Sequence, residues 1–514
     1  MKEYQATMVS ACSSHGCFLY ANKDKLRLLY FCIGEALTDV AVYTYVSNDR
    51  YLEEIIYVEA LSCISIYRLP ASFGELVAIQ GAAFRSGVKG NRNEMNIKNV
   101  WAKRGTLKVS NQSELLIGLK KKVPVIEITQ TLKVNNTITI PEKVTLKGAT
   151  TDTRIIFEAG MDGIEVTNNN TLSDLCIEVS PKNRAIFNSY NQKSMGNLKI
   201  KNVKTIGSVQ ILAKSKIQNG HIEMINLHII EADVLNRMER PEGFGVSVIQ
   251  GALTIWNQQQ SKDSVLSVSI NGIQIGGKDK PVLGSGIFLS GYGPNALPNH
   301  NGILTADVID TDEIHSTGKI RLGISDVISG GLFIVHGVKV KNMTNRGTVT
   351  TYGVNDMVLD NWGEVSQWIA KKSITSHGAS GIGFVNFGKI SVLTIQSTIE
   401  TFGQGARGFN AYTGDIGTAC FKKVITHGDG AIGIQTSTRI DRLIVNDGIF
   451  TYGNIGDSLV EGIIKKIPAQ GLSILKGTKA NSFEIHGGIH VKGKDVDILN
   501  IENNAAIKSL MVKE

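Results

Sequence analysis

The chain has 514 residues, 42% of them hydrophobic and 6% aromatic, a balance that is compatible with a folded protein. Its 54 glycines against 9 prolines are typical of tight turns between short strands. The net charge of +8 is modest for this length, so it permits an acidic polymer as partner, and no run of basic residues marks a nucleic-acid site.

The six cysteines are unevenly spread, and this spacing favours free thiols in a reducing compartment over a disulfide framework. Cys12 and Cys17 lack a second pair of ligands, so we predict neither a metal nor another cofactor. The start of the chain lacks the order of a signal peptide, and no apolar stretch reaches the roughly 18 residues of a membrane span. We expect a protein without a membrane span that is cytoplasmic or exported by a non-classical route; its oligomeric state stays open.

Residues 1–94 differ from the rest of the chain, because they concentrate tyrosines and cysteines and show no internal period. Residues 52–69 are apolar and rich in β-branched side chains, which fits one or two strands or a helix. Met95 is followed at once by the sequence that leads into the regular part. We therefore predict a dispensable N-terminal region, 1–94, and a main domain, 95–514.

Short apolar segments separated by Asn, Asp, Gly and Pro turns begin at residue 106 and are typical of strands. After the first of them, Asn111 or Ser113 can cap a short helix with Leu115, Leu116 and Leu119 on one face. The strands predicted in this part cover residues 106–109, 125–128, 138–140, 144–148, 155–157, 163–166 and 175–179.

The helix and the segment from Ile140-Pro141 to Gly148, which reads Ile-Pro-Glu-Lys-Val-Thr-Leu-Lys-Gly, resemble right-handed parallel β-helix proteins of the pectin lyase-like superfamily. The resemblance covers roughly residues 106–507 and implies an all-β solenoid whose first coil is capped by a helix. Enzymes of that superfamily cleave polysaccharides with acidic clusters in segments such as Asn-Thr-Asp, Asp-Asp, Gly-His-Gly and Arg-Ile-Lys. None of these segments occurs in this chain, so the resemblance implies the fold and leaves the activity open.

The middle of the chain is less regular. Strands are predicted at residues 198–200, 222–225, 246–248, 268–270 and 287–289. Polar segments at 233–243 and 257–263, and the Gly-Pro-Asn-rich segment 290–302, are predicted to be loops that leave the solenoid.

One five-residue pattern then returns five times, and each of its final glycines lies 25 residues after the previous one. The copies are residues 349–353, 374–378, 399–403, 424–428 and 449–453. Each has a β-branched residue, a hydroxyl residue two positions later, then an aromatic residue or histidine, and glycine. Related copies at 314–318 and 489–493 lie 35 residues before and 40 residues after, as loop insertions would produce. A fixed period of this length predicts a solenoid of 25-residue coils.

Successive coils advance by one strand spacing, about 4.8 Å, so equivalent side chains should lie above one another. We predict that the hydroxyl residues form an inward ladder and that the rings form an outward one, with the parity made uncertain by the adjacent glycine. The hydroxyl ladder would contain Thr351, Ser376, Thr401, Thr426 and Thr451. The ring ladder would contain Tyr352, His377, Phe402, His427 and Tyr452.

The ring ladder is the best candidate for a binding surface, because sugars stack on aromatic side chains and basic residues on its flanks suit acidic sugars. The alternative is a structural stack covered by neighbouring loops. The basic residues near the pattern are Lys371, Lys372, Arg407, Lys422 and Lys423.

Acidic residues before the first related copy are the weaker, catalytic candidates: Asp307, Asp310 and Asp312. Two carboxylates could perform acid–base chemistry or hold Ca²⁺. However, Asp312 aligns with Ser397 and Asp447 in the repeat, which favours a turn position that needs only local hydrogen bonds.

Two further signals are explained by the repeat itself. Residues 403–408 and 428–433 match the dinucleotide fingerprint G-x-G-x-x-G, but a strand rather than a helix is predicted after each. The histidines His315, His377, His427 and His490 invite a metal interpretation, yet His377 and His427 are two coils, about 9.6 Å, apart, too far for one ion.

These observations favour a carbohydrate-associated β-helix scaffold that binds a polysaccharide without chemistry. The first alternative is a polysaccharide lyase or glycoside hydrolase with a non-standard site, and a weaker one is an adhesin or a tailspike-like structural protein.

Overall fold

The computed structural model divides the chain into two compact units, Met1–Ala102 and Lys103–Glu514. It describes eight strands of the first unit, and residues 105–291, 301–460 and 463–514 of the second. The strands of the first unit pair antiparallel, β1 to β2 to β3, β4 to β5 to β6, and β7 to β8. Their bounds are β1 (Thr7–Met8), β2 (Phe18–Asn22), β3 (Lys25–Arg27), β4 (Leu29–Ile33), β5 (Val40–Thr44), β6 (Ile56–Val58), β7 (Ile66–Tyr67) and β8 (Ala78–Ile79). Two of them, β6 and β7, lie within residues 52–69.

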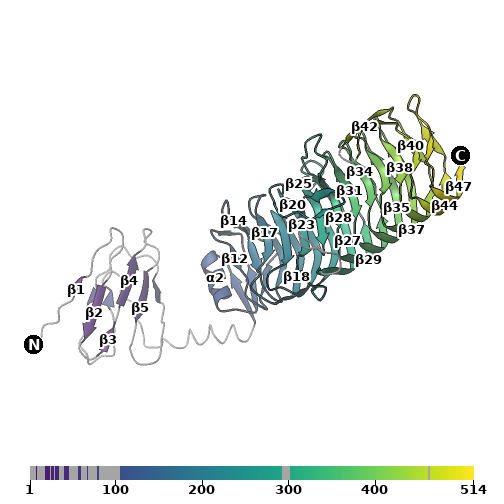
Figure 1. Cartoon of the computed structure of the whole chain (residues 1–514). Coiled ribbons are helices and arrows are strands. Elements are labelled where there is room, and N and C mark those ends of the chain that lie inside the picture. The colour runs from purple at the N-terminus through teal and green to yellow at the C-terminus, as the bar shows by residue number, and fades with distance from the viewer. Residues whose placement is uncertain are drawn as a thin grey trace, which may run out of the picture. The chain divides into compact units, whose positions relative to one another are not determined.

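The second unit is a parallel β-helix, as predicted, in which each coil passes through three faces and each strand pairs in parallel with its equivalents in the coils before and after it (Figure 1). The first face contains β9 (Thr106–Val109), β10 (Val125–Ile128), β13 (Thr145–Gly148), β29 (Val338–Asn345), β32 (Glu364–Ala370), β39 (Arg439–Val445), β44 (Lys479–His486) and β47 (Ala506–Lys513). The second contains β11 (Leu132–Val134), β14 (Arg154–Phe157), β25 (Val282–Leu283), β30 (Val349–Thr351), β33 (Ile374–Ser376), β40 (Ile449–Thr451) and β45 (Ile489–Val491).

Long strands bend around the corner between these two faces and belong to both. They are β16 (Thr171–Glu178), β18 (Ser194–Ile206), β20 (Asn219–Glu231), β24 (Val265–Ile275), β27 (Ile303–Thr317), β35 (Lys389–Thr401) and β37 (Asp415–Thr426). The third face is a separate sheet with one strand from each coil. Its strands are β12 (Ile138–Thr139), β15 (Ile164–Val166), β17 (Arg184–Asn188), β19 (Ser208–Ala213), β23 (Gly251–Asn257), β26 (Ser285–Ser290), β28 (Val327–Ile334), β31 (Asp356–Asn361), β34 (Ile382–Asn386), β36 (Arg407–Ala411), β38 (Ile432–Thr436), β43 (Leu472–Ile474) and β46 (Leu499–Ile501).

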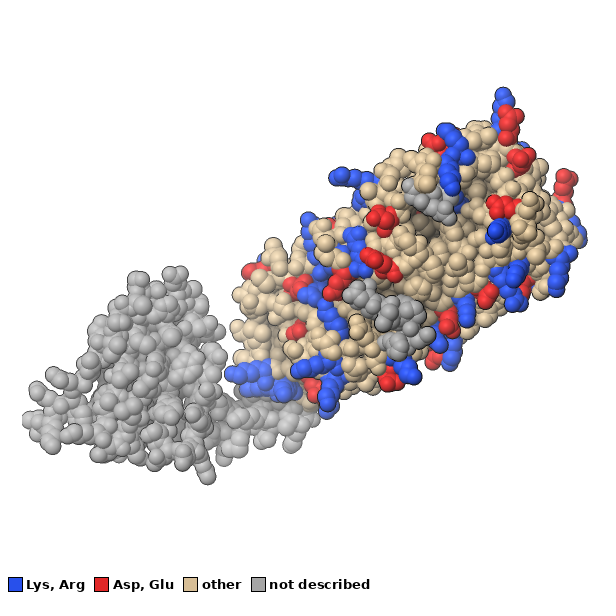
Figure 2. All heavy atoms as spheres, in the orientation of Figure 1, with Lys and Arg blue, Asp and Glu red and all other residues tan. Residues whose placement is uncertain are grey.

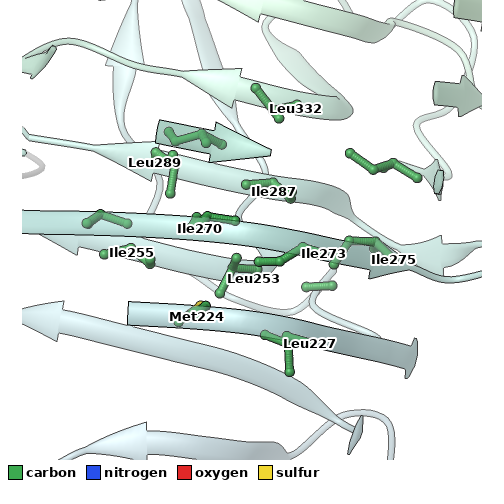
Figure 3. Packing of buried hydrophobic residues seen from close by; sticks show 14 of the residues in the cluster. Met224, Leu227, Leu253, Ile255, Ile270, Ile273, Ile275, Ile287, Leu289 and Leu332 are labelled. Atoms are coloured by element: carbon green, nitrogen blue, oxygen red, sulfur yellow. The ribbon is translucent and has the colours of Figure 1, made fainter. Parts of the chain in front are cut away.

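One continuous apolar core runs inside the coils from Val109 to Ile485. Alternation along each strand sends one set of side chains inward, and the parallel register places like above like. In the middle coils, for example, Leu253 lies beside Ile287 of the next coil, and Ile287 lies beside Leu332 of the coil after that (Figure 3). Because each coil buries its apolar side chains against its neighbours, the stack rather than any single coil is the stable unit.

The helix α2 (Gln112–Lys120) precedes β10 and packs on the first coil, as the sequence predicted. Asn111 is its N-cap, and the side-chain oxygen of Asn111 accepts a hydrogen bond from Glu114 N at 2.9 Å. Leu115 and Leu119 are buried, but Leu116 is 45% exposed, so the predicted apolar face is narrower than expected.

Insertions leave the coils where the period is interrupted. The strand predicted at 246–248 is present as β22 (Val246–Val248), and it pairs in parallel with β28 of the third face. However, it also pairs antiparallel with β21 (Glu242–Gly243) and lies off the main path of the third face, so its assignment to a coil was wrong. A short segment with two valines fits the edge of an insertion as well as a coil. A second hairpin, β41 (Gly456–Val460) with β42 (Ile463–Ile467), accounts for the added length after residue 453. Most of the predicted loop 290–302 lies outside the described residues.

The glycine that ends each repeat is imposed by the distance between coils. A Cβ on Gly378 would lie 1.7 Å from the carbonyl oxygen of Gly353, and one on Gly403 would lie 1.8 Å from that of Gly378. No side chain fits at such distances, so glycine stacks on glycine at this corner.

Candidate functional site

The five predicted rings form one ladder at the corner between the second and third faces. Their centroids are separated by 5.3 Å (Tyr352–His377), 5.0 Å (His377–Phe402), 4.5 Å (Phe402–His427) and 5.2 Å (His427–Tyr452). Neighbouring rings are nearly parallel, with interplanar angles of 2° to 11°. The predicted stacking of 25-residue coils is therefore confirmed.

The rings point outward and the hydroxyl residues point inward, as strict alternation along the strand predicts. All five members of the hydroxyl ladder are fully buried. Phe402 is 40% and Tyr452 46% exposed, so described loops do not cover the ring ladder. Since each inner ring is stacked on both sides, its faces lie against its neighbours and mainly its outer edge meets solvent.

Neighbouring polar groups form hydrogen bonds with members of the ring ladder. The Nε2 atom of His427 lies 2.9 Å from Glu400 Oε1, and the Nδ1 atom of His315 lies 3.0 Å from the Tyr352 hydroxyl. Partial burial lowers the pKa of His377, with Glu400 acting in the opposite direction, so this imidazole is neutral at pH 7. A neutral imidazole offers one donor and one acceptor to a ligand.

The basic residues expected on the flanks divide into two groups. Lys371, Lys372 and Lys422 are exposed at the other end of the short second-face strands, and Lys423 Nζ lies 5.2 Å above the ring of Phe450. Arg407 is different, because it is only 5% exposed on the outer side of the third face. Its assignment as an exposed flank was wrong, because the hairpin β41–β42, far along the chain, supplies Ser458 to its guanidinium.

The acidic candidates lie on β27, where this strand bends between the first and second faces. Asp307 pairs with Lys341 at 2.6 Å. Arg346 lies between the other two, with Nη1 at 3.8 Å from Asp310 and Nε at 3.5 Å from Asp312. The carboxylates are thus matched by cations on an open surface, and in the described residues no group of three or more His, Cys, Asp or Glu side chains could hold a metal ion.

The turn predicted at Asp312 is wrong, because Asp312 lies within the strand β27, which continues through this position. The repeat alignment itself holds: Ile314 pairs with Val349, so Asp312 aligns with Gly347, and a Cβ on this glycine would meet the Asp312 backbone. The two G-x-G-x-x-G matches lie in turns, with Gly405 and Gly430 at φ +64° and +67°, and they lead into the strands β36 and β38.

A second group of rings, which the sequence analysis did not identify, lies at the corner between the third and first faces. We call it the outer ring cluster: Phe244, His336, Trp362, Phe387 and Tyr412. Phe387 stacks on Tyr412 at 4.9 Å and 6°, and Phe244 from the β21–β22 turn stacks on Phe387 at 4.3 Å and 19°. Phe244 has φ +54°, a conformation that is costly for a bulky residue, and its ring contacts offset that cost. The 25-residue spacing of Phe387 and Tyr412 was a visible signal, but no spacing could have indicated Phe244.

Two carboxyl groups are buried beside these corners. Asp356 accepts hydrogen bonds from Gly353 N at 2.6 Å and Gly318 N at 3.2 Å, and burial raises its pKa to about 7. Burial also raises the pKa of Asp360 well above its usual value, and the nearby Trp362 side chain offsets only part of this effect. Neither carboxyl oxygen of Asp360 has a hydrogen-bond partner among the described residues.

A comparison with protein-family models and with curated proteins found no match to this chain. Within the part of the chain that the structure describes, no helix has the length and apolarity to cross a bilayer. On the face drawn in Figure 2, Lys and Arg alternate with Asp and Glu, and no large area carries one sign of charge.

Proposed function

We propose that this protein is a β-helix scaffold, related to the pectin lyase-like superfamily, that binds an extended polysaccharide along the ring ladder without cleaving it. The observation that carries the proposal is the regular, solvent-exposed row of Tyr, His and Phe side chains on five consecutive coils. A straight, periodic row favours a ligand that is itself straight and periodic.

The chemistry of the ring ladder suits sugars. The exposed edges of Phe402 and Tyr452 offer apolar contact to the C–H groups of a sugar ring. His377, His427 and the tyrosine hydroxyls offer hydrogen bonds to sugar hydroxyl groups between these contacts. Because the rings already support one another, little side-chain entropy is lost on binding.

Glycan-array binding followed by affinity electrophoresis in polysaccharide gels tests the proposal. We expect Phe402→Ala and Tyr452→Ala to weaken retardation by at least tenfold, since each removes an exposed ring from the row. Tyr412→Ala is the matched control, because Tyr412 is 39% exposed against 40% for Phe402 and lies on the other corner. Equal loss in Tyr412→Ala, or no retardation of the wild type by any polysaccharide, would contradict the proposal.

A polysaccharide lyase or hydrolase remains the second candidate, because Asp310 and Asp312 both approach Arg346. An assay of reducing ends and of the ultraviolet absorbance of unsaturated products on each bound polysaccharide separates the two. Binding without product supports the scaffold. Product formation that is lost in Asp310→Ala would replace it with the enzyme.

A further inference from the structure

The outer side of the third face carries a row of aligned apolar side chains that one charged residue interrupts. In the pairing register Met357 lies beside Ile382, Ile382 beside Arg407, and Arg407 beside Ile432. The three apolar members are buried, and Met357 and Ile382 belong to a cluster outside the main core. An isoleucine at 407 would continue the row, so the arginine is not explained by packing.

The guanidinium of Arg407 is held by neutral groups only. Its Nε donates to Gln435 Oε1 at 3.0 Å, and its Nη1 donates to Gly405 O at 2.6 Å and to Ser458 Oγ at 3.1 Å. Among the described residues no partner meets the two N–H groups of Nη2.

Two acidic residues of the neighbouring turn and hairpin have other partners. Asp457, adjacent to Ser458, pairs with Lys466 at 2.8 Å. Asp429 accepts a hydrogen bond from Asn454 N at 2.7 Å. Arg407 is therefore buried, with only 5% of its surface exposed, and no carboxylate of the described residues forms an ion pair with it.

A buried cation without a counter-ion is costly, and proteins rarely keep one unless an anion completes the site. The guanidinium of arginine keeps its charge in proteins, so it cannot relieve this cost by becoming neutral. The guanidinium also presents paired N–H groups in a plane, which matches carboxylate, sulfate and phosphate oxygens. Two of its three nitrogens are fixed by Gln435, Gly405 and Ser458, so the third is already oriented for a ligand.

We propose that Arg407, held by Gln435, Gly405 and Ser458, is a binding site for a single anionic group such as a carboxylate or a sulfate. Arg407 begins β36, five residues after Phe402 of the ring ladder, so the acidic substituent of a bound polysaccharide is one source of that group. A free inorganic anion is the other. The site rests on its own contacts, and only the choice of an acidic polysaccharide rests on the proposed function.

Calorimetric titration of the full chain with sodium sulfate, against sodium chloride at equal ionic strength, tests the site directly. We expect saturable binding of sulfate by the wild type and at least tenfold weaker binding by Arg407→Gln, which removes the charge but keeps polar groups. Arg442→Gln is the control, since Arg442 is an exposed arginine that pairs with Glu484. Absence of saturable sulfate binding by the wild type, or an unchanged affinity in Arg407→Gln, would overturn the proposal.

A second variant distinguishes anion binding from a purely structural role of Arg407. Sulfate stabilises most proteins by exclusion from their surfaces, so a rise in melting temperature alone is not evidence. We expect Arg407→Ile to melt no lower than the wild type without sulfate, because it completes the apolar row, and to lose the additional rise that sulfate gives the wild type. A large drop in melting temperature with an unchanged response to sulfate would mean that Arg407 only fastens the hairpin.

A sulfated and a neutral oligosaccharide of equal length then distinguish the two sources of the anion. A preference of the wild type for the sulfated one that disappears in Arg407→Gln identifies the polymer. Sulfate binding without that preference identifies a free anion, and this outcome leaves the ring-ladder proposal to be judged by its own variants.

Discussion

The ring ladder and the outer ring cluster lie at opposite ends of the same third-face strands, but they are built differently. Every member of the ring ladder occupies the same position of the repeat, so the coils alone determine it. The outer ring cluster needs Phe244, which arrives from an insertion more than 100 residues earlier in the chain than Phe387. The comparison indicates that repeat positions build extended surfaces, whereas insertions cover and close them.

Truncation of one ring at each corner is expected to give the largest difference in unfolding free energy between the two corners. Trp362 is 3% exposed under the insertion, so Trp362→Ala should cost about 3–5 kcal/mol of unfolding free energy. Phe402 is 40% exposed, and Phe402→Ala should cost about 1 kcal/mol, mainly from lost stacking. Denaturant unfolding of both variants measures the difference. Equal costs would mean that the two corners are covered to the same degree.

Glycine substitutions compare the tight corner with the insertion. Gly403→Ala places a Cβ 1.8 Å from a carbonyl oxygen of the preceding coil, and moving the coils apart should cost about 3 kcal/mol. Gly245 has open space around it, so Gly245→Ala should cost about 1 kcal/mol, from its φ of +81° alone. Melting temperatures of the two variants, measured side by side, check the order. A more stable Gly403→Ala protein would contradict the glycine contact.

The pH dependence of stability tests the titration of Asp356, which lies in the first coil of the regular repeat. Its pKa of about 7 exceeds that of an unfolded aspartate, so the folded protein holds a proton that the unfolded chain loses above about pH 4. The contribution of Asp356 to the free energy of unfolding is therefore greatest below about pH 4. It decreases by up to about 4 kcal/mol as the pH rises to about 7.

Asp356→Asn keeps an acceptor for Gly353 and Gly318 but cannot ionise. We expect it to gain stability relative to the wild type as pH rises from 5 to 8, because only the wild type then carries a buried charge. Melting temperatures of both proteins at four pH values in this range measure the difference. A constant difference at all four would show that Asp356 does not titrate there.

Most of the fold could be predicted from the sequence because the repeat fixes it. The constant spacing of residues 353, 378, 403, 428 and 453 gives the coil length, and alternation gives the inward hydroxyls and outward rings. Asn111 likewise indicated the helix cap. These features depend on neighbours in the same or the adjacent coil.

What could not be predicted depends on contacts between distant segments. Arg407 was predicted as a basic residue on the flank of the ring ladder, but the hairpin at 456–467 places Ser458 against it. Val246–Val248 had the composition of a coil strand, but it pairs at the edge of an insertion. The burial of Asp360 likewise follows from the cluster on the outer side of the third face, in which its aligned neighbours Phe333 and Val385 lie.

The central claim is that residues 25 positions apart lie side by side on the exposed corner. The most direct test is pyrene excimer fluorescence of a Phe402→Cys/His427→Cys double variant, whose wild-type rings lie 4.5 Å apart. The account predicts strong excimer emission from the labelled double variant and only the background of native cysteines from the wild type and each single variant. Emission from the double variant that equals the sum of the single variants would contradict the stacking of the coils.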